Sequence, residues 1–202
     1  MIIAIIGLDG SGKSTFKDGF YERLVLSGYQ VSTYHWRPGI LPYRNNKNKV
    51  QEYKFSNPYN TPRRNRFLST CILCYISVDF IIGYFLIKLQ SLYNSKLIIL
   101  WERPFLDVLI SPERYGIKVG YGILNFALSC IPRPDALVIL ETDAKTLLQR
   151  KNEIPLKIID QKITSFKKTV SIYECKNKIF VDTQHNSISN CIDIVWRKFM
   201  NS

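Results

Sequence analysis

The sequence predicts an α/β fold, a three-layer sandwich in which helices cover both faces of a five-stranded parallel sheet. Short β-favouring runs recur five times along the 202 residues, with helical stretches between them. Strands that alternate with helices in this way form a parallel sheet. A glycine-rich loop also joins the first predicted strand directly to the first predicted helix.

The first quarter of the chain contains two strands and one helix. Met1 to Ile6 is an unbroken apolar run, which is typical of a central strand buried on both faces. The helix after the glycine loop spans about 13–27, and Gly28 ends it. Gln30 to Trp36 predicts the second strand. Residues at about 40–66 are polar, basic and rich in Asn and Pro, so they predict a loop.

A long apolar stretch, Phe67 to Leu89, predicts a helix that packs against the sheet. It is nearly long enough to cross a bilayer. However, Asp79 lies in its middle, where an acid costs about 2.5–3.5 kcal/mol on insertion scales. We therefore expect no membrane span. Cys71 and Cys74 form a C-x-x-C within this helix, and without a second cysteine pair we expect small core residues rather than zinc ligands.

The rest of the chain continues the alternation of strands and helices, which is typical of a parallel sheet. In order, the predicted segments are a strand at 96–101, one or two helices within 105–130, a strand at 136–141, helices at about 143–151 and 158–175, a strand at 178–182 and a helix at 187–200.

Length and composition indicate one globular domain, because 46% of the residues are hydrophobic and 22% are charged. We predict a single domain over 1–202, with a basic loop at about 40–66 and a lid at about 150–160. The five cysteines are an odd number, and no signal peptide is recognisable before the first strand. Reduced thiols and a cytoplasmic location are therefore expected.

The formal net charge is +12, and much of it lies in two segments, 37–66 and 145–178. Basic segments favour an acidic ligand, either a phosphorylated small molecule or a nucleic acid backbone. A solvated surface rich in lysine explains each single residue equally well. Charge alone therefore does not decide between these interpretations.

The glycine-rich loop is the most specific motif. Residues 7–15 read Gly-Leu-Asp-Gly-Ser-Gly-Lys-Ser-Thr, a complete match to G-x-x-x-x-G-K-[ST]. Glycines let backbone N–H groups converge on phosphate oxygens, and the following helix directs the positive end of its dipole at the same anion. The loop therefore predicts a P-loop fold that binds ATP and Mg²⁺. The expected ligands of the nucleotide are Gly7, Asp9, Gly10, Ser11, Gly12, Lys13, Ser14 and Thr15.

Within this loop, Lys13 can reach the β- and γ-phosphates and Ser14 can ligand Mg²⁺. Asp9 is an acid in an anion-binding loop, so we expect it to face the phosphoryl acceptor, although an Asp that only stabilises the turn fits too. The other variable loop positions carry no cation. Arg150 is the candidate to supply transition-state charge from a lid.

Glu102 and Arg103 follow the third predicted strand, at the edge of the sheet where ligands bind in parallel α/β folds. Glu102 can hold Mg²⁺ or accept a proton, and Arg103 can clamp a phosphate. Arg37 follows the second strand at the same edge and is the expected reader of an acidic acceptor. An ordinary surface pair at 102–103 and an ordinary turn at 37 are the competing interpretations.

These residues resemble the thymidylate kinase family of nucleoside monophosphate kinases. More narrowly, they resemble thymidylate kinase-like proteins found among bacterial surface-polysaccharide genes. The resemblance rests on the loop at 7–15, Glu102-Arg103-Pro104, the run 134–141 with Leu147 and Arg150, Trp36-Arg37-Pro38-Gly39, Asp79, Asp107 and the run 111–115.

The resemblance implies that Lys13, Ser14 and Thr15 bind ATP–Mg²⁺, that Arg103 holds the acceptor phosphate and that Asp9 faces the acceptor sugar. It also implies that Arg150 serves the lid and that the chain forms a homodimer. The sequence departs from the family's pattern at position 102, where Glu replaces Asp, and in the segment after the second strand. These departures bear on the identity of the acceptor.

The sequence therefore predicts a kinase that transfers the γ-phosphoryl group of ATP to a small phosphorylated acceptor, first of all a nucleoside monophosphate. A kinase acting on a sugar or sugar acid of surface polysaccharide is the second interpretation, and a nucleotide-binding regulator without transfer activity is the third. A polynucleotide end kinase that uses the basic segment 37–66 is less favoured, so no nucleic acid partner is expected.

Overall fold

The structure is a computed structural model that describes residues 1–42, 65–150 and 156–200, with only the backbone at 150 and 156–158. The chain forms two compact units. The first unit comprises Met1–Trp36, Lys88–Pro104 and Arg133–Ser202. The second comprises Arg37–Ile87 and Phe105–Pro132. The predicted basic loop and lid fall mostly outside the described residues, and the single domain over 1–202 stays a prediction.

The first unit contains a five-stranded parallel sheet with the strand order β2-β3-β1-β4-β5. The apolar run at the start of the chain forms the central strand β1, whose six residues are all buried, as predicted. The strands are β1 (Ile2–Gly7), β2 (Gln30–His35), β3 (Leu97–Glu102), β4 (Ala136–Glu141) and β5 (Lys178–Asp182).

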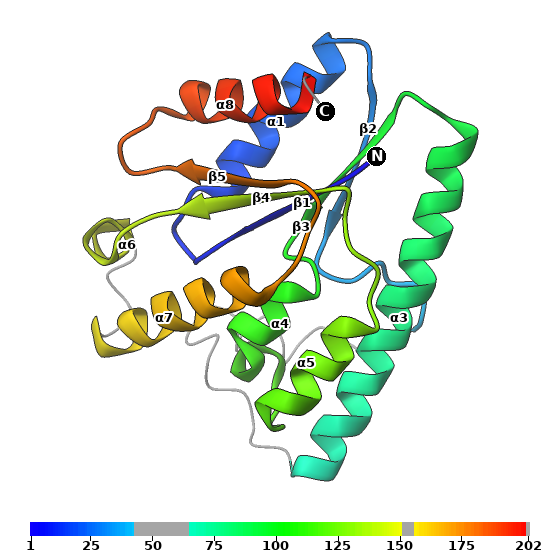
Figure 1. Cartoon of the computed structure of the whole chain (residues 1–202), viewed down its shortest axis with the longest axis vertical. Coiled ribbons are helices and arrows are strands. Elements are labelled where there is room, and N and C mark those ends of the chain that lie inside the picture. The colour runs from blue at the N-terminus through cyan, green and yellow to red at the C-terminus, as the bar shows by residue number, and fades with distance from the viewer. Residues whose placement is uncertain (43–64, 151–155, 201–202) are drawn as a thin grey trace. The chain divides into compact units, whose positions relative to one another are not determined.

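Helices cover both faces of this sheet, which confirms the predicted three-layer α/β fold (Figure 1). Helices α1 (Lys13–Leu26) and α8 (Ile188–Met200) lie on one face, and α7 (Leu156–Ile172) lies on the other. Phe16 and Phe20 of α1 pack with alternate residues of the strands and with Val195 of α8 in one buried cluster. A short helix, α6 (Ala144–Arg150), follows β4.

The described residues of the second unit are mainly helical and include most of α3 (Arg66–Tyr93), whose last turns belong to the first unit. Its other elements are α4 (Leu106–Ile110), the short 3₁₀ helix η1 (Pro112–Tyr115) and α5 (Tyr121–Ser129). Phe80 of α3 packs edge-on against Phe105, with 5.3 Å between the ring centroids.

Asp79 of α3 is fully buried and organises the loop at residues 37–41. Its carboxylate accepts the backbone N–H groups of Gly39 (3.2 Å) and Leu41 (2.6 Å) and lies 3.5 Å from Arg37 Nε. A buried carboxylate is costly unless it is paired and hydrogen-bonded, and Asp79 is both. Asp79, the acid in the middle of the apolar helix, thus joins α3 to the loop at residues 37–41.

The opposite face of α3 corrects the expectation for its two cysteines. Cys71 and Cys74 were expected in the core, but both are exposed. They share a helical face with exposed Phe67 and Val78, whereas the buried face carries other residues of the same apolar run. An almost uniformly apolar helix gives no periodic signal that tells its two faces apart.

By length and composition α3 could cross a membrane, since its most apolar 18-residue window has a mean hydropathy of 2.0 and is 39% buried. The contacts of Asp79 would be lost in lipid. The absence of a membrane span stays a prediction that these contacts favour.

Candidate functional site

The glycine-rich loop leaves the carboxyl end of β1 at Gly7 and enters α1 at Lys13. Gly10 (φ 92°) and Gly12 (φ 83°) adopt left-handed backbone conformations that side chains disfavour. A Cβ atom on Gly7 would lie 2.4 Å from Ser11 Oγ and 3.0 Å from the carbonyl oxygen of Leu140. The glycines of the motif therefore have two separate tasks: two turn the chain, and one lets the loop lie directly against β4.

The first turn of α1 suits an anion. Gly12 occupies the N-cap position, and no side chain caps the helix there. The N–H groups of a helix's first turn have no partners within the helix, and together with the helix dipole they attract negative charge. Ser14 and Thr15 are exposed in this turn, so a ligand can reach their hydroxyl groups.

Lys13 lies folded against the loop and is almost completely buried. Its ammonium group donates hydrogen bonds to the carbonyl oxygens of Gly7 (2.9 Å) and Leu8 (2.7 Å), and it lies 4.0 Å from Asp9 Oδ1. The cation is thus held inside the loop next to the first turn of α1, where a phosphate oxygen could replace a carbonyl oxygen as its partner.

Glu102 ends β3 beside the loop because β3 pairs with β1, with Glu102 opposite Ile5. Glu102 is buried, with 3% of the residue exposed. Oε1 lies 3.4 Å from the Ser14 hydroxyl, which donates to it, and Oε2 accepts a hydrogen bond from Lys17 Nζ at 3.3 Å. A hydroxyl oxygen and a carboxylate oxygen at this spacing are hard donors of the kind that Mg²⁺ prefers.

Arg103 adopts a left-handed backbone conformation (φ 54°), which is unusual for a residue other than glycine. Its N–H donates to the carbonyl oxygen of Ile5 at 3.2 Å. Its Nη2 lies 2.7 Å from Asp9 Oδ1, in an ion pair that is mostly shielded from solvent. Strained backbone conformations are frequent at functional sites. In this structure the strained residue is Arg103, whose guanidinium group lies against Asp9 of the glycine loop.

Five of the predicted site residues therefore lie together at the carboxyl edge of the sheet, namely Asp9, Lys13, Ser14, Glu102 and Arg103. Sequence reasoning missed Lys17. A signal was available, because Lys17 lies four residues after Lys13 and side chains at this spacing share a helix face.

Two of the predicted site residues, Arg37 and Arg150, belong neither to the glycine loop nor to the end of β3. Arg37 belongs to the second unit, where it pairs with Asp79 and donates from Nη2 to the carbonyl oxygen of Leu41 at 3.1 Å. Arg150 ends α6, and its side chain lies outside the described residues. The roles expected for both stay predictions.

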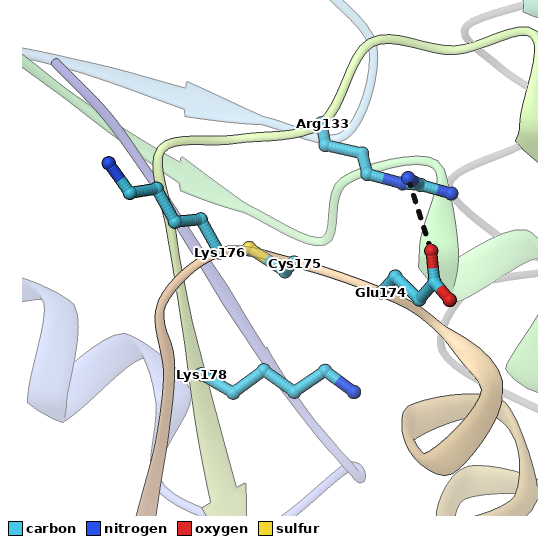
Figure 2. A pocket seen from close by; sticks show the side chains of 5 residues that line it. All are labelled: Arg133, Glu174, Cys175, Lys176 and Lys178. Atoms are coloured by element: carbon cyan, nitrogen blue, oxygen red, sulfur yellow. Dashed lines mark ion pairs between the residues drawn. The ribbon is translucent and has the colours of Figure 1, made fainter.

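A hollow of about 450 Å³ occurs at the end of the sheet where strands β4 and β5 begin (Figure 2). It is lined by Arg133, Glu174, Cys175, Lys176 and Lys178, which lie near the starts of β4 and β5. Arg133 and Glu174 form an ion pair across 3.7 Å (Figure 2). No predicted site residue lines this hollow, and the glycine-rich loop lies at the opposite ends of the strands.

A parallel sheet in the order 2-3-1-4-5, with a glycine-rich loop between its central strand and the next helix, defines an α/β fold of the P-loop type. Among solved structures, the thymidylate kinase of Candida albicans is similar, with a TM-score of 0.64 and 16% sequence identity over 99% of this chain and 91% of that chain. No family model matches the sequence, and no curated protein matches it. At 16% identity the structural similarity establishes the fold, and this fold agrees with the resemblance of the sequence to thymidylate kinases. The narrower resemblance to proteins of surface-polysaccharide gene clusters stays a prediction.

Proposed function

We propose that this protein is a phosphotransferase that moves the γ-phosphoryl group of ATP to a nucleoside monophosphate. The observation that carries the proposal is the convergence of Lys13, Ser14, Glu102 and Arg103 around a glycine loop at the carboxyl edge of a P-loop sheet. Phosphoryl transfer needs little covalent chemistry from a protein. It needs positioned cations and hydrogen-bond donors around the phosphates, and these residues supply them.

The loop residues fit a magnesium-bound nucleotide. The uncapped first turn of α1 offers N–H donors to phosphate, and Ser14 with Glu102 offers the oxygen atoms that would hold Mg²⁺. When bound, Mg²⁺ neutralises charge on the β- and γ-phosphates. Lys13 would exchange a carbonyl partner for a phosphate oxygen, which places a fixed positive charge where the transferred group develops negative charge.

Arg103 and Asp9 support an acceptor that carries a phosphate. A guanidinium group can bind a phosphate through two parallel hydrogen bonds, and the ion pair with Asp9 holds one edge of Arg103 in place beside the loop. Asp9 then orients the arginine, and we propose that the acceptor phosphate binds to this oriented guanidinium. We place Arg37 and the lid residue Arg150 among the further contacts of the substrates.

The proposal is tested by a panel of acceptors with ATP and Mg²⁺: each nucleoside monophosphate, a set of sugars and sugar acids, and oligonucleotides. We expect a nucleoside monophosphate to give the highest kcat/KM. Lys13→Ala should reduce this value by at least about 100-fold, because a transition-state donor is worth about 2.7–4 kcal/mol. Lys96→Ala removes an exposed lysine at the opposite end of β3 and should leave activity unchanged.

Selective phosphorylation of a sugar would contradict the proposed acceptor but keep the kinase chemistry. Binding of ATP without turnover on any acceptor, with Lys13→Ala equal to the wild type in every assay, would favour a regulator instead. Turnover of oligonucleotides with steep salt dependence would point to a polynucleotide kinase.

A further inference from the structure

The hollow at the starts of β4 and β5 is separate from the loop site. All of its lining residues belong to the first unit. The glycine-rich loop leaves β1 at the carboxyl end of the same parallel sheet. A strand of this length runs for about 20 Å, so a molecule in the hollow would not touch the reacting groups at the loop. A ligand of the hollow would therefore bind in addition to the reactants.

Hydrogen bonds between the protein's own groups hold the segments that form the hollow. The Cys175 thiol donates to the carbonyl oxygen of Pro134 at 3.4 Å. The Asn177 side chain donates to the carbonyl oxygen of Asp135 at 3.2 Å. Both bonds fix the connection between α7 and β5 against the residues just before β4. The chain itself thus forms the hollow before any ligand arrives, as is usual for small-molecule sites.

The charges of the lining favour an anion. Arg133, Lys176 and Lys178 are cations, and Glu174 is the only acid among the lining residues. In Figure 2 the side chains of Arg133 and Lys178 extend toward the same side as Glu174, whereas Lys176 extends away from them. The cations on the side of Glu174 therefore outnumber the acid, and Lys176 adds positive charge from the other side.

Arg133 is held in a position that suits a phosphate. Its guanidinium group lies 5.9 Å from the centroid of the Tyr173 ring, whose face supports the cation. Its ion pair with Glu174 spans 3.7 Å, between side chains that are 51% and 85% exposed. Such an exposed pair contributes little to stability. A phosphate that accepts two parallel hydrogen bonds from the guanidinium can therefore replace the carboxylate.

Lys178 is the second cation that the fold holds in place. Its ammonium group donates to the carbonyl oxygen of Val170 at 2.9 Å, near the end of α7. An ammonium group has three N–H donors. This hydrogen bond therefore orients the side chain without using its full capacity to donate.

The size and charge of the hollow define the class of its ligand. Its volume of about 450 Å³ lies in the range of small-molecule sites. Such sites are usually lined by apolar side chains, whereas this lining is mostly charged. A nucleic acid presents a row of phosphates, and the exposed Glu174 would repel those next to the bound one. We propose that the hollow binds a single phosphate group of a small organic phosphate, with Arg133 and Lys178 as its ligands.

Cys175 makes binding measurable at the hollow itself. The probe is ribose 5-phosphate, and the controls are ribose and potassium chloride at equal ionic strength. We expect ribose 5-phosphate to slow the reaction of Cys175 with N-ethylmaleimide, because the ligand covers this half-buried thiol. Mass spectrometry of the modified peptides gives the rate for each cysteine. Cys71, Cys74 and Cys130 belong to the second unit and should react at unchanged rates.

Variants of the lining test the assigned ligands. Arg133→Gln and Lys178→Gln should each raise the concentration of ribose 5-phosphate for half-protection at least about tenfold, since each removes a hydrogen bond to a charged group. Glu174→Gln should lower it, because the carboxylate no longer competes for Arg133. Lys96→Gln is the matched control, since it removes an exposed lysine that does not line the hollow, and it should change nothing. Circular dichroism should show all four variants to be folded.

Lys13→Ala separates this site from the loop site. The variant disables the loop and should keep the protection of Cys175, so a failure of the proposed transfer activity would not alter the result. Protection that disappears in Lys13→Ala would place the probe in the loop and overturn the proposal. So would equal protection by ribose or chloride, or half-protection that is unchanged in both Arg133→Gln and Lys178→Gln. Protection by an oligonucleotide or by phosphatidic acid vesicles alone would overturn it too, and would assign the basic surface to a nucleic acid or a membrane.

Discussion

At the scale of single residues, Lys17 is the informative side chain of the loop site. Glu102 directs one carboxylate oxygen to Ser14 and the other to Lys17, so the lysine fixes the orientation in which Oε1 faces the hydroxyl group. Its other carboxylate neighbour is the exposed Asp18, 3.5 Å away. We regard Lys17 as a positioning residue that acts through Glu102.

Lys17→Ala should therefore lower kcat about tenfold or more with little change in the KM of the acceptor, since losing a hydrogen bond to a charged group costs about 1.5–3 kcal/mol. Calorimetry gives a readout without turnover: the gain in ATP affinity on adding Mg²⁺ should shrink in the variant. Lys17→Arg should restore most of both quantities, and Asp18→Ala should change neither. An unaltered Mg²⁺ effect in Lys17→Ala would show that the lysine only fills space.

At the scale of elements, the packing of α3 depends on one glycine. A Cβ atom on Gly83 would lie 2.2 Å from Cβ and 2.3 Å from Cγ of Pro38, a rigid ring that cannot rotate away. Gly83→Ala gains about 1 kcal/mol of helix propensity but overpacks the contact, which costs about 1–3 kcal/mol and more where atoms overlap this strongly. We expect a net loss in the free energy of unfolding, measured by urea denaturation.

Gly122 of α5 provides the comparison, because a Cβ atom there would meet nothing within 4 Å. Gly122→Ala should be neutral or stabilise the protein by up to about 1 kcal/mol. If Gly83→Ala were as stable as Gly122→Ala, the close approach of Pro38 to α3 would not exist in solution.

Helices and strands are also the level at which the sequence predicted the structure best. Apolar or β-favouring runs and their glycine or proline boundaries located all five strands to within one residue at each end. The signal is strongest in β1, β3 and β4, whose burial on both faces gives almost unbroken apolar runs, whereas β2 and β5 are partly exposed. The motif spacing also located Lys13 and Ser14. The pairing of β1 with β3, which brings Glu102 to Ser14, depends on strand order, and strand order is not a local property of the sequence. The ion pairs Asp9–Arg103 and Arg37–Asp79 join residues that are far apart along the chain, so neither could be predicted.

At the scale of the whole molecule, stability in acid should depend on Asp135, which precedes β4. Its carboxylate accepts the N–H of Ile2 at 2.7 Å and pairs with Lys88 Nζ at 2.8 Å, so it ties the starts of β1 and β4 to the end of α3. Partial burial favours the neutral acid. The hydrogen bonds from Lys88 and Ile2 outweigh it and hold the pKa of Asp135 below its ordinary value of 3.8.

Because the folded protein binds this proton more weakly than the unfolded chain, the contribution of Asp135 to stability is fully present above about pH 4 and is lost as the pH falls through the lowered pKa. Asp135→Asn should reduce the free energy of unfolding by about 0.5–1 kcal/mol at pH 7, the range of a partly exposed ion pair. The difference from the wild type should shrink as the pH is lowered below 3.8. Urea denaturation of the wild type and the variant, at pH 7 and below pH 3.8, measures this difference in the free energy of unfolding. Glu174→Gln is the control, because it removes a charge from an exposed ion pair. A loss of equal size at both pH values would mean that Asp135 stabilises the sheet through its shape and not through its charge.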